Sequence, residues 1–161
     1  MSERTALVLV ASTRAAAGDY PDRSGPIAVE FLRELGFSTP DATVVADAEL
    51  PSALSELFSE PTALPDVVLT SGGTGITADD NTVELITPHL DKELPGIVHA
   101  FWATGRENIA TAVLSRAVAG ITGRTFVMTL PGSTGGVKDG VTTLRPILNH
   151  IVEQLEGSHE H

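Results

Sequence analysis

Residues 66–80, DVVLTSGGTGITADD, decide the fold that the rest of this 161-residue sequence has to support. Positions 67–69, Val-Val-Leu, form a short apolar run of the kind found in buried parallel strands. The glycines that follow allow a sharp turn and a close approach of the backbone to a bound group. Asn81 and Glu84 have the spacing of an N-cap and N3 pair, so they predict a helix directly after the loop.

A strand, a glycine-rich loop and a helix start together indicate an anion-binding site. Unpaired backbone amides and the helix dipole then point at one spot. The far side of the loop carries two acids, Asp79 and Asp80, which do not suit bare phosphate. Two carboxylates suit a phosphate that is bound together with a divalent metal, and this is the ligand that the loop predicts.

The composition limits the classes of partner and compartment. Twenty-one Asp and Glu against ten Lys and Arg give a formal net charge of −11, which disfavours a nucleic acid or an anionic membrane as partner. The sequence has no cysteine, so disulfides and thiolate chemistry are excluded. Neither an apolar leader nor a run of membrane-spanning length is visible, and we expect a cytoplasmic protein. The length fits a single domain at 1–157, followed by a disordered tail at 158–161.

Apolar runs and amphipathic stretches alternate along the chain, which is the pattern of a doubly wound α/β domain. Strands are expected at 5–11, 41–46, 67–69 and 125–130, and helices at 24–35, 50–58, 82–90, 97–105 and 141–155 with an interruption at Pro146. We further expect Ser24 to cap the first helix, 93–96 to form a turn, and 134–136 to form a loop. Residues 116–121 and 124–130 flank Thr122-Gly123 as in a β-hairpin. The predicted fold is a three-layer α/β/α sandwich with a mostly parallel sheet and one antiparallel hairpin.

Polar and glycine-rich segments follow each predicted parallel strand. Right-handed crossovers bring the carboxyl ends of such strands to one edge of the sheet, where open α/β folds bind their ligands. We therefore expect one cleft that contains Ser12 to Arg14, Asp47, Ser71 to Asp80, and Pro131 to Ser133.

Three common motifs are compared with this loop: the P-loop, the dinucleotide-binding pattern and the serine nucleophile elbow. The P-loop is excluded, because Ile76-Thr77 follow Gly75 where Lys and Ser or Thr are needed. Residues 73–78 fit the G-x-G-x-x-A dinucleotide pattern only formally, since the acid that should follow a second strand, Asp91, follows a helical stretch. A nicotinamide-dependent oxidoreductase remains an alternative on that basis. A serine nucleophile is unsupported, because the sequence has no G-x-S-x-G elbow.

Four short motifs in order resemble one known family. They are TSGGTG at 70–75 with Asp80, LPG at 94–96, LSR at 114–116 and LPGS at 130–133. Together they are similar to the molybdenum cofactor biosynthesis proteins of the Mog/MoaB type, which include the molybdopterin adenylyltransferases and the G domain of gephyrin. The resemblance extends from about Ala6 to Leu155, nearly the whole chain.

The resemblance implies a homotrimer that binds molybdopterin and joins AMP from Mg²⁺-ATP to its phosphate. Pyrophosphate is released, and the product passes to a molybdate-insertion enzyme. An apolar stripe of Ile97, Val98, Phe101 and Trp102 also favours the trimer. Within the same family, a non-catalytic molybdopterin-binding or assembly protein is the alternative.

The same resemblance assigns residues, motif by motif. It implies catalytic and metal-binding roles for Asp47 and Asp80, and no role for Asp79. Nucleotide and phosphate binding falls to Ser71, Gly72, Gly73, Thr74, Gly75, Pro131, Gly132 and Ser133, and pterin binding to Ser12, Arg14, Ser115 and Arg116.

Overall fold

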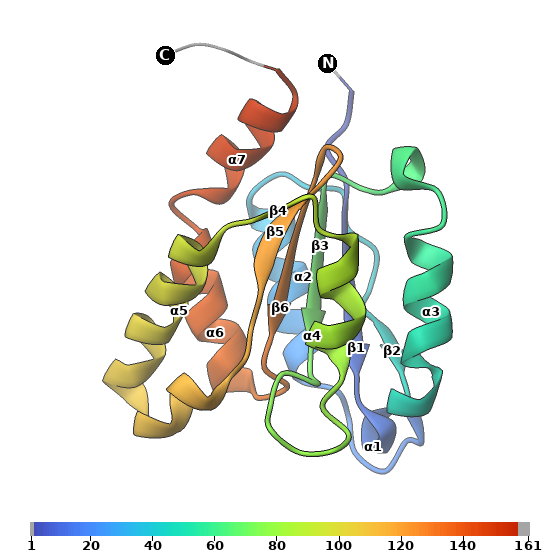
Figure 1. Cartoon of the computed structure of the whole chain (residues 1–161), viewed down its shortest axis with the longest axis vertical. Coiled ribbons are helices and arrows are strands. Elements are labelled where there is room, and N and C mark those ends of the chain that lie inside the picture. The colour runs from blue at the N-terminus through green and yellow to red at the C-terminus, as the bar shows by residue number, and fades with distance from the viewer. Residues whose placement is uncertain (1, 158–161) are drawn as a thin grey trace.

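The structure is a computed structural model that describes residues 2–157, so the predicted tail at 158–161 lies outside it. Its centre is a six-stranded sheet in the order β2-β1-β3-β6-β5-β4 (Figure 1). The strands are β1 (Ala6–Ala11), β2 (Thr43–Val45), β3 (Val67–Ser71), β4 (Lys92–Glu93), β5 (Ala119–Thr122) and β6 (Thr125–Leu130). The first four strands in this order are parallel, whereas β5 and β4 continue the sheet in antiparallel pairs.

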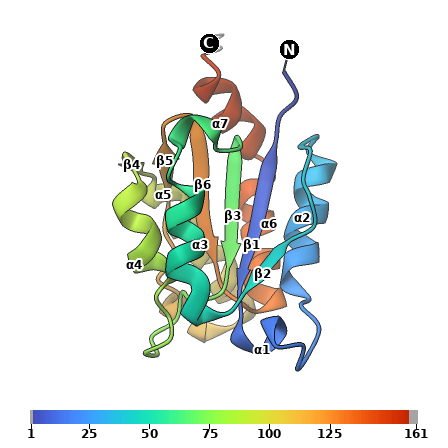
Figure 2. The ribbon, with the colours of Figure 1, turned by 90° about the vertical axis from the view of Figure 1, so that its right-hand side faces the viewer.

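Helices cover both faces of the sheet (Figures 1 and 2). One face packs against α2 (Ser24–Glu34), α5 (Pro95–Asn108), α6 (Thr134–Leu144) and α7 (Leu148–Leu155), and the other against α3 (Leu50–Leu57) and α4 (Thr82–Ile86). Shorter helical segments are α1 (Thr13–Ala16), η1 (Asp47–Glu49), η2 (Pro61–Ala63), η3 (Thr87–His89) and η4 (Ala110–Leu114). The predicted three-layer sandwich with a mostly parallel sheet and one hairpin is confirmed.

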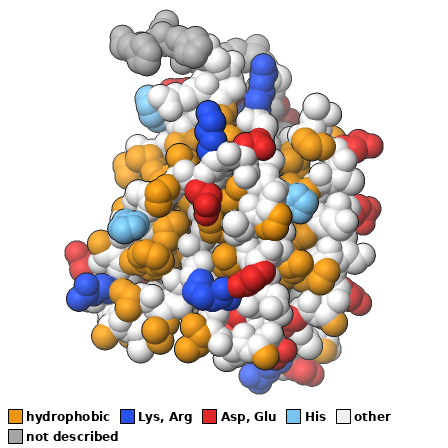
Figure 3. All heavy atoms as spheres, in the orientation of Figure 1, with side chains coloured by type: hydrophobic (Ala, Val, Ile, Leu, Met, Phe, Trp, Pro, Cys, Tyr) orange, Lys and Arg blue, Asp and Glu red, His pale blue; other side chains and the backbone are white. Residues whose placement is uncertain are grey.

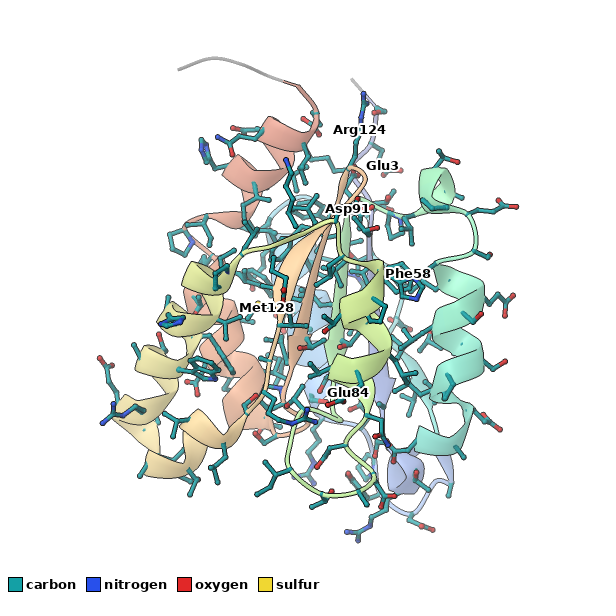
Figure 4. All side chains as sticks on the ribbon, viewed as in Figure 1. Glu3, Phe58, Glu84, Asp91, Arg124 and Met128 are labelled. Atoms are coloured by element: carbon teal, nitrogen blue, oxygen red, sulfur yellow. The ribbon has the colours of Figure 1, made fainter. Side chains whose placement is uncertain are left out.

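The layers follow from the alternation of side chains along the central strands. In β3, Val67 and Leu69 belong to the apolar cluster under α2, while Val68 belongs to the cluster under α3. Met128 of β6 lies in the first cluster and Phe58 in the second, and Figure 4 labels both side chains. Because both faces of each central strand are covered, these strands read as continuous apolar runs, and the sequence alone locates them.

Two predicted helix caps are wrong. Ser24 is the first residue of α2, and the cap is the side chain of Asp22, which accepts hydrogen bonds from the N–H groups of Ser24 and Gly25. Asn81 precedes α4 but does not cap it, because its amide group donates to the carbonyl oxygen of Ala78. Glu84, the predicted N3 partner, pairs with Arg116 instead. Asp22 and Ala78 are close in sequence to the groups that they bond, whereas Arg116 is a partner for Glu84 that only the fold supplies.

Two predicted irregular segments are regular. Residues 93–96 do not form a turn, since Glu93 pairs with Gly120 in the sheet and Pro95 begins α5, where a proline costs no hydrogen bond. Residues 134–136 form the first turn of α6, and Ser133 is its N-cap. Helix α5 also continues past the predicted end at Gly105 to Asn108. None of the helices in residues 2–157 has the length and apolar character needed to cross a membrane.

Candidate functional site

A cavity of about 1640 Å³ lies at the edge of the sheet where the parallel strands end, at the lower edge in Figure 1. Segments that follow β1, β2, β3 and β6 line it, together with η4 and the first turns of α6. The predicted convergence of strand-end loops is therefore confirmed. Pockets for one small ligand are usually about 300–1,000 Å³, so this cavity has room for two ligands side by side.

Most residues assigned from sequence line this cavity, but two do not. The lining includes Ser12, Arg14, Asp47, Gly72, Gly73, Thr74, Gly75, Asp80, Ser115, Pro131, Gly132 and Ser133. Ser71 is buried below the cavity floor, and its hydroxyl donates to the carbonyl oxygen of Pro131 at 2.9 Å. Arg116 lies behind the loop after β3 rather than at the cavity surface.

The loop after β3 needs glycine at two adjacent positions. Gly72 and Gly73 have φ angles of 99° and 72°, in the left-handed region that other residues rarely adopt. A methyl group on Gly72 would lie 2.2 Å from the carbonyl oxygen of Ala11, and one on Gly73 would lie 2.0 Å from the hydroxyl of Thr82. The turn is thus closed on both sides by neighbouring elements, which fixes the direction of its amide groups.

Two loops that line the same cavity carry backbone amides without hydrogen-bond partners in residues 2–157. The N–H of Gly72 donates to the carbonyl oxygen of Leu130, but those of Gly73 and Thr74 have no hydrogen-bond partner within residues 2–157. The N–H groups of Thr134 and Gly135 lie at the start of the eleven-residue helix α6, where helix geometry leaves them unpaired. Such amides bind anions, so the two loops together suit one or more phosphate groups.

Arg116 braces the glycine loop from outside the cavity. Its Nε donates to the carbonyl oxygen of Gly75 at 2.8 Å, and Nη2 donates to that of Asp80 at 2.9 Å. The remaining guanidinium edge pairs with the carboxylate of Glu84, which Figure 4 places on α4 beside the loop. The hydrogen bond with Glu84 raises the pKa of Arg116, and it lowers the pKa of Glu84. Arg116 does not line the cavity and its donors are used by the loop, so its assignment to the pterin stays a prediction.

Asp80 closes the same loop from within. Its Oδ2 accepts hydrogen bonds from the N–H of Thr77 at 3.0 Å and from the Thr77 hydroxyl at 2.7 Å. Partial burial would raise the pKa of Asp80, but the hydrogen bonds from Thr77 and Gly75 and the charge of Arg116 together hold it below its ordinary value. Asp80 is therefore a carboxylate that both shapes the loop and faces the cavity.

Asp47 lies on the far side of β1 from the glycine loop. The hydroxyl of Thr13 donates to its Oδ2 at 2.6 Å and accepts from its backbone N–H at 3.1 Å, so the carboxylate is tied to α1. Throughout residues 2–157, no three His, Asp or Glu side chains are grouped to hold a metal ion. This donor set fits Mg²⁺ that arrives on a nucleotide, because one or two carboxylates then suffice beside the substrate phosphates.

Sequence reasoning missed a polar pair at the opposite end of the cavity. Asp139 of α6 is 9 % exposed and lines the cavity, and the amide of Asn108 donates to its Oδ1 at 2.9 Å. A charged residue between Val137 and Gly140 on the inward face of a helix was the available signal. It is easily lost in a stretch assigned by its apolar positions alone.

Comparison with known proteins decides the family. A family model described as a probable molybdopterin binding domain matches residues 7–150. The chain belongs to this family. The resemblance seen in the four sequence motifs is thereby confirmed.

Known relatives are similar in sequence to this protein along nearly the whole chain. Molybdenum cofactor biosynthesis protein B of Bacillus subtilis is 38% identical over 94% of this chain and 89% of its own length. A molybdopterin adenylyltransferase of Pyrococcus furiosus is 38% identical over 91% and 88%. The chain spans only about half, 49%, of a bifunctional molybdenum cofactor biosynthesis protein of Chlorobaculum tepidum, at 35% identity.

Two solved structures of the molybdopterin-binding family have closely similar folds. The molybdopterin biosynthesis Mog protein of Mycobacterium ulcerans superposes with a TM-score of 0.88 at 39% identity, over 98% of this chain and all of that one. The tungsten cofactor synthesizing protein MoaB of Pyrococcus furiosus gives 0.84 at 36% identity, over 96% and 98%.

The dinucleotide pattern requires an acid, Asp91, near the glycine loop. The position of Asp91 fits the molybdopterin-binding family instead of that pattern. Asp91 accepts a hydrogen bond from the N–H of Gly123 at the hairpin turn, at the opposite end of the sheet from the glycine loop (Figure 4). It therefore cannot contact a ribose bound at that loop. Of the four family motifs, LPG at 94–96 also lies away from the cavity, where it begins α5.

Proposed function

We propose that this protein acts in molybdenum cofactor biosynthesis by transferring AMP from Mg²⁺-ATP to the phosphate of molybdopterin. Family membership and the named adenylyltransferase relative support the reaction class. The observation that carries the proposal is the pair of loops at 72–75 and 131–136. Their unpaired amides meet in one cavity that is large enough for two phosphate-bearing substrates.

Transfer of AMP depends on the positioning of the two substrates more than on reactive side chains of the protein. A phosphate oxygen of molybdopterin attacks the α-phosphorus of ATP, the bond to the bridging α–β oxygen breaks, and pyrophosphate leaves with that oxygen. Backbone amides of the two loops would hold the phosphates in line for this exchange. Asp47 and Asp80 are the carboxylates that would hold Mg²⁺, which would neutralise the charge that develops on pyrophosphate.

The strand order suggests how two substrates share the cavity. Ser12 and Arg14 follow β1, whereas Ser115 precedes β5, and three strand spacings of about 4.8 Å separate these two ends of the sheet edge. The glycine loop lies between them. We therefore assign the phosphates to the middle, the pterin to the Ser115 side, and the nucleotide to the side of Ser12 and Arg14. This narrows the sequence-based assignment, which gave both ends to the pterin.

The trimer stays part of the proposal, on weaker support than the sequence suggested. Val98 and Phe101 of the apolar stripe are buried inside the chain itself, and only Ile97 and Trp102 remain partly exposed. Figure 3 shows hydrophobic side chains at the surface over α5. Light scattering at micromolar concentration should give three times the chain mass, and a monomer would contradict the assembly.

Pyrophosphate release is the direct test of the reaction. Purified protein with molybdopterin, ATP and Mg²⁺ should release pyrophosphate, and omission of any one component should abolish the release. Binding of molybdopterin and ATP without release would support the non-catalytic assembly protein instead. A thermal shift with NAD or NADP but not with ATP would support the oxidoreductase alternative and overturn the proposal.

A further inference from the structure

The carboxylate of Asp139 has no part in the transfer of AMP described above. It lines the cavity beside α5 and η4, three residues after Gly136 of the second loop. The residue is only 9 % exposed, and buried polar groups normally have hydrogen-bond partners. Oδ2 of Asp139 is not one of the fully enclosed polar atoms that lack a partner, so it is open to a ligand in the cavity.

Within the described part of the chain, only one of its two oxygens accepts a hydrogen bond. Oδ1 accepts from the amide of Asn108, but no donor in residues 2–157 hydrogen-bonds to Oδ2. Opposite Oδ2 the chain has a glycine in the middle of α5. A methyl group on Gly105 would lie 3.3 Å from Oδ2 and 2.7 Å from the Cβ of Ala112. A glycine inside a helix costs about 1 kcal/mol against alanine, and here it leaves room first for Ala112 and then for the carboxylate.

The residues around Asp139 indicate what kind of ligand group could donate a hydrogen bond to its Oδ2. Phe101 and Asn108 of α5 and Ala112 and Leu114 of η4 line the cavity together with Asp139. Apolar walls around one fixed carboxylate suit a flat heterocycle that presents two adjacent N–H groups. A 2-amino-4-oxopyrimidine ring has this edge, formed by its 2-amino group and its N3–H. Adenine does not, because its amino group is flanked by a ring nitrogen that accepts hydrogen bonds.

We propose that Asp139, oriented by Asn108, binds the 2-amino-4-oxopyrimidine ring of the pterin and selects it against rings that lack these donors. The identity of the ring rests on the proposed function, while the need for a donor at Oδ2 rests on the geometry. The position agrees with a pterin on the Ser115 side of the cavity, because Ser115 directly follows η4.

A matched pair of small ligands tests the proposal without any turnover. 6-Hydroxymethylpterin carries the 2-amino group, and 6-hydroxymethyllumazine has a carbonyl oxygen in its place. Ligand-observed NMR, which detects millimolar Kd values, should show that the native protein prefers the pterin by on the order of ten- to hundredfold. Asp139→Asn keeps the bond from Asn108 and places an NH₂ group where Oδ2 was. It should abolish or reverse this preference.

The controls separate this proposal from the function on which it rests. Glu56→Gln, an exposed change on α3, should keep the native preference. If Asp139→Asn melts too early to be used, Asn108→Ala should weaken the preference severalfold, because the carboxylate loses its orientation. Equal binding of both ligands by the native protein, binding of neither, or a preference that survives Asp139→Asn would overturn the proposal. Pyrophosphate release is measured independently, so a protein that selects the pterin without releasing pyrophosphate would contradict the reaction only.

Discussion

The two glycine-rich loops of the cavity follow neighbouring strands, yet they are held in different ways. The loop at 72–75 turns through left-handed glycines and is braced by Arg116 and Asp80. The loop at 131–136 has no residue with positive φ and is held by its own helix, through the hydrogen bond from the N–H of Gly136 to the Ser133 hydroxyl. The first loop depends on distant side chains, whereas the second depends on local geometry.

Because of this difference, the glycines of the two loops are needed for different reasons. In the first loop, glycine is needed for its backbone angle and because a neighbouring strand leaves no room. In the second, a methyl group on Gly135 would have no other heavy atom within 4 Å, and the backbone there is helical. Sequence patterns treat both loops as one signal, but substitutions should separate them.

The largest expected effect on stability comes from adding a methyl group to the first loop, and the same change in the second loop serves as the control. Gly72→Ala should lower the free energy of unfolding by on the order of 3 kcal/mol, because the methyl meets a backbone oxygen of β1 and the φ angle becomes strained. Gly135→Ala is the matched control and should leave stability unchanged or raise it by up to about 1 kcal/mol. Urea unfolding measures both variants. Equal losses would mean that the two loops do not differ in this way.

The next effect concerns catalysis at the braced loop. Asp80→Asn keeps the size of the side chain but removes the charge that faces the cavity, so pyrophosphate release should fall on the order of 10²-fold. Stability should fall by only about 1 kcal/mol, since an amide oxygen can still accept from Thr77. Release and melting temperature are measured on the same preparation. A stable variant with native turnover would reduce Asp80 to a loop residue.

A smaller effect, on ATP affinity, should follow when Arg116, which braces the glycine loop, is replaced by lysine. Arg116→Lys cannot donate to the carbonyl oxygens of Gly75 and Asp80 and also pair with Glu84, because an ammonium lacks the planar fork of the guanidinium. ATP affinity measured by calorimetry should fall about tenfold, or about 1.4 kcal/mol. Arg145→Lys, at an exposed pair with Glu34, is the control and should bind normally. Native affinity in Arg116→Lys would show that the loop holds its shape without the brace.

The smallest effect is the dependence of stability on pH. Partial burial is outweighed by hydrogen bonds from Thr77 and Gly75, which hold the pKa of Asp80 below its ordinary value, so its contribution to stability is present at neutral pH and is lost as pH falls through the lowered pKa. Urea midpoints between about pH 5 and about pH 2 should fall less steeply for Asp80→Asn than for the native chain, by less than about 1 kcal/mol. Identical slopes would indicate that the loop hydrogen bonds to Asp80 do not persist in solution.

The strands and the meeting of their loops could be predicted from sequence because apolar runs and turn residues are local signals. The roles of Arg116 and Asp139 could not, since each depends on contacts with residues 31 to 41 positions away. The caps failed for a related reason. Asp22 and Ser24 are both reasonable caps by type, and only the path of the chain decides which one reaches the helix N–H groups.

The chain has a single tryptophan and a single tyrosine, and they lie toward opposite ends of the cavity. The indole N–H of Trp102 donates to the carbonyl oxygen of Ser115 at 2.8 Å, whereas Tyr20 lines the other end beneath the guanidinium of Arg14. Each end therefore carries one natural chromophore. Light emitted by the indole reports on the Ser115 end of the cavity, with no label added to the protein.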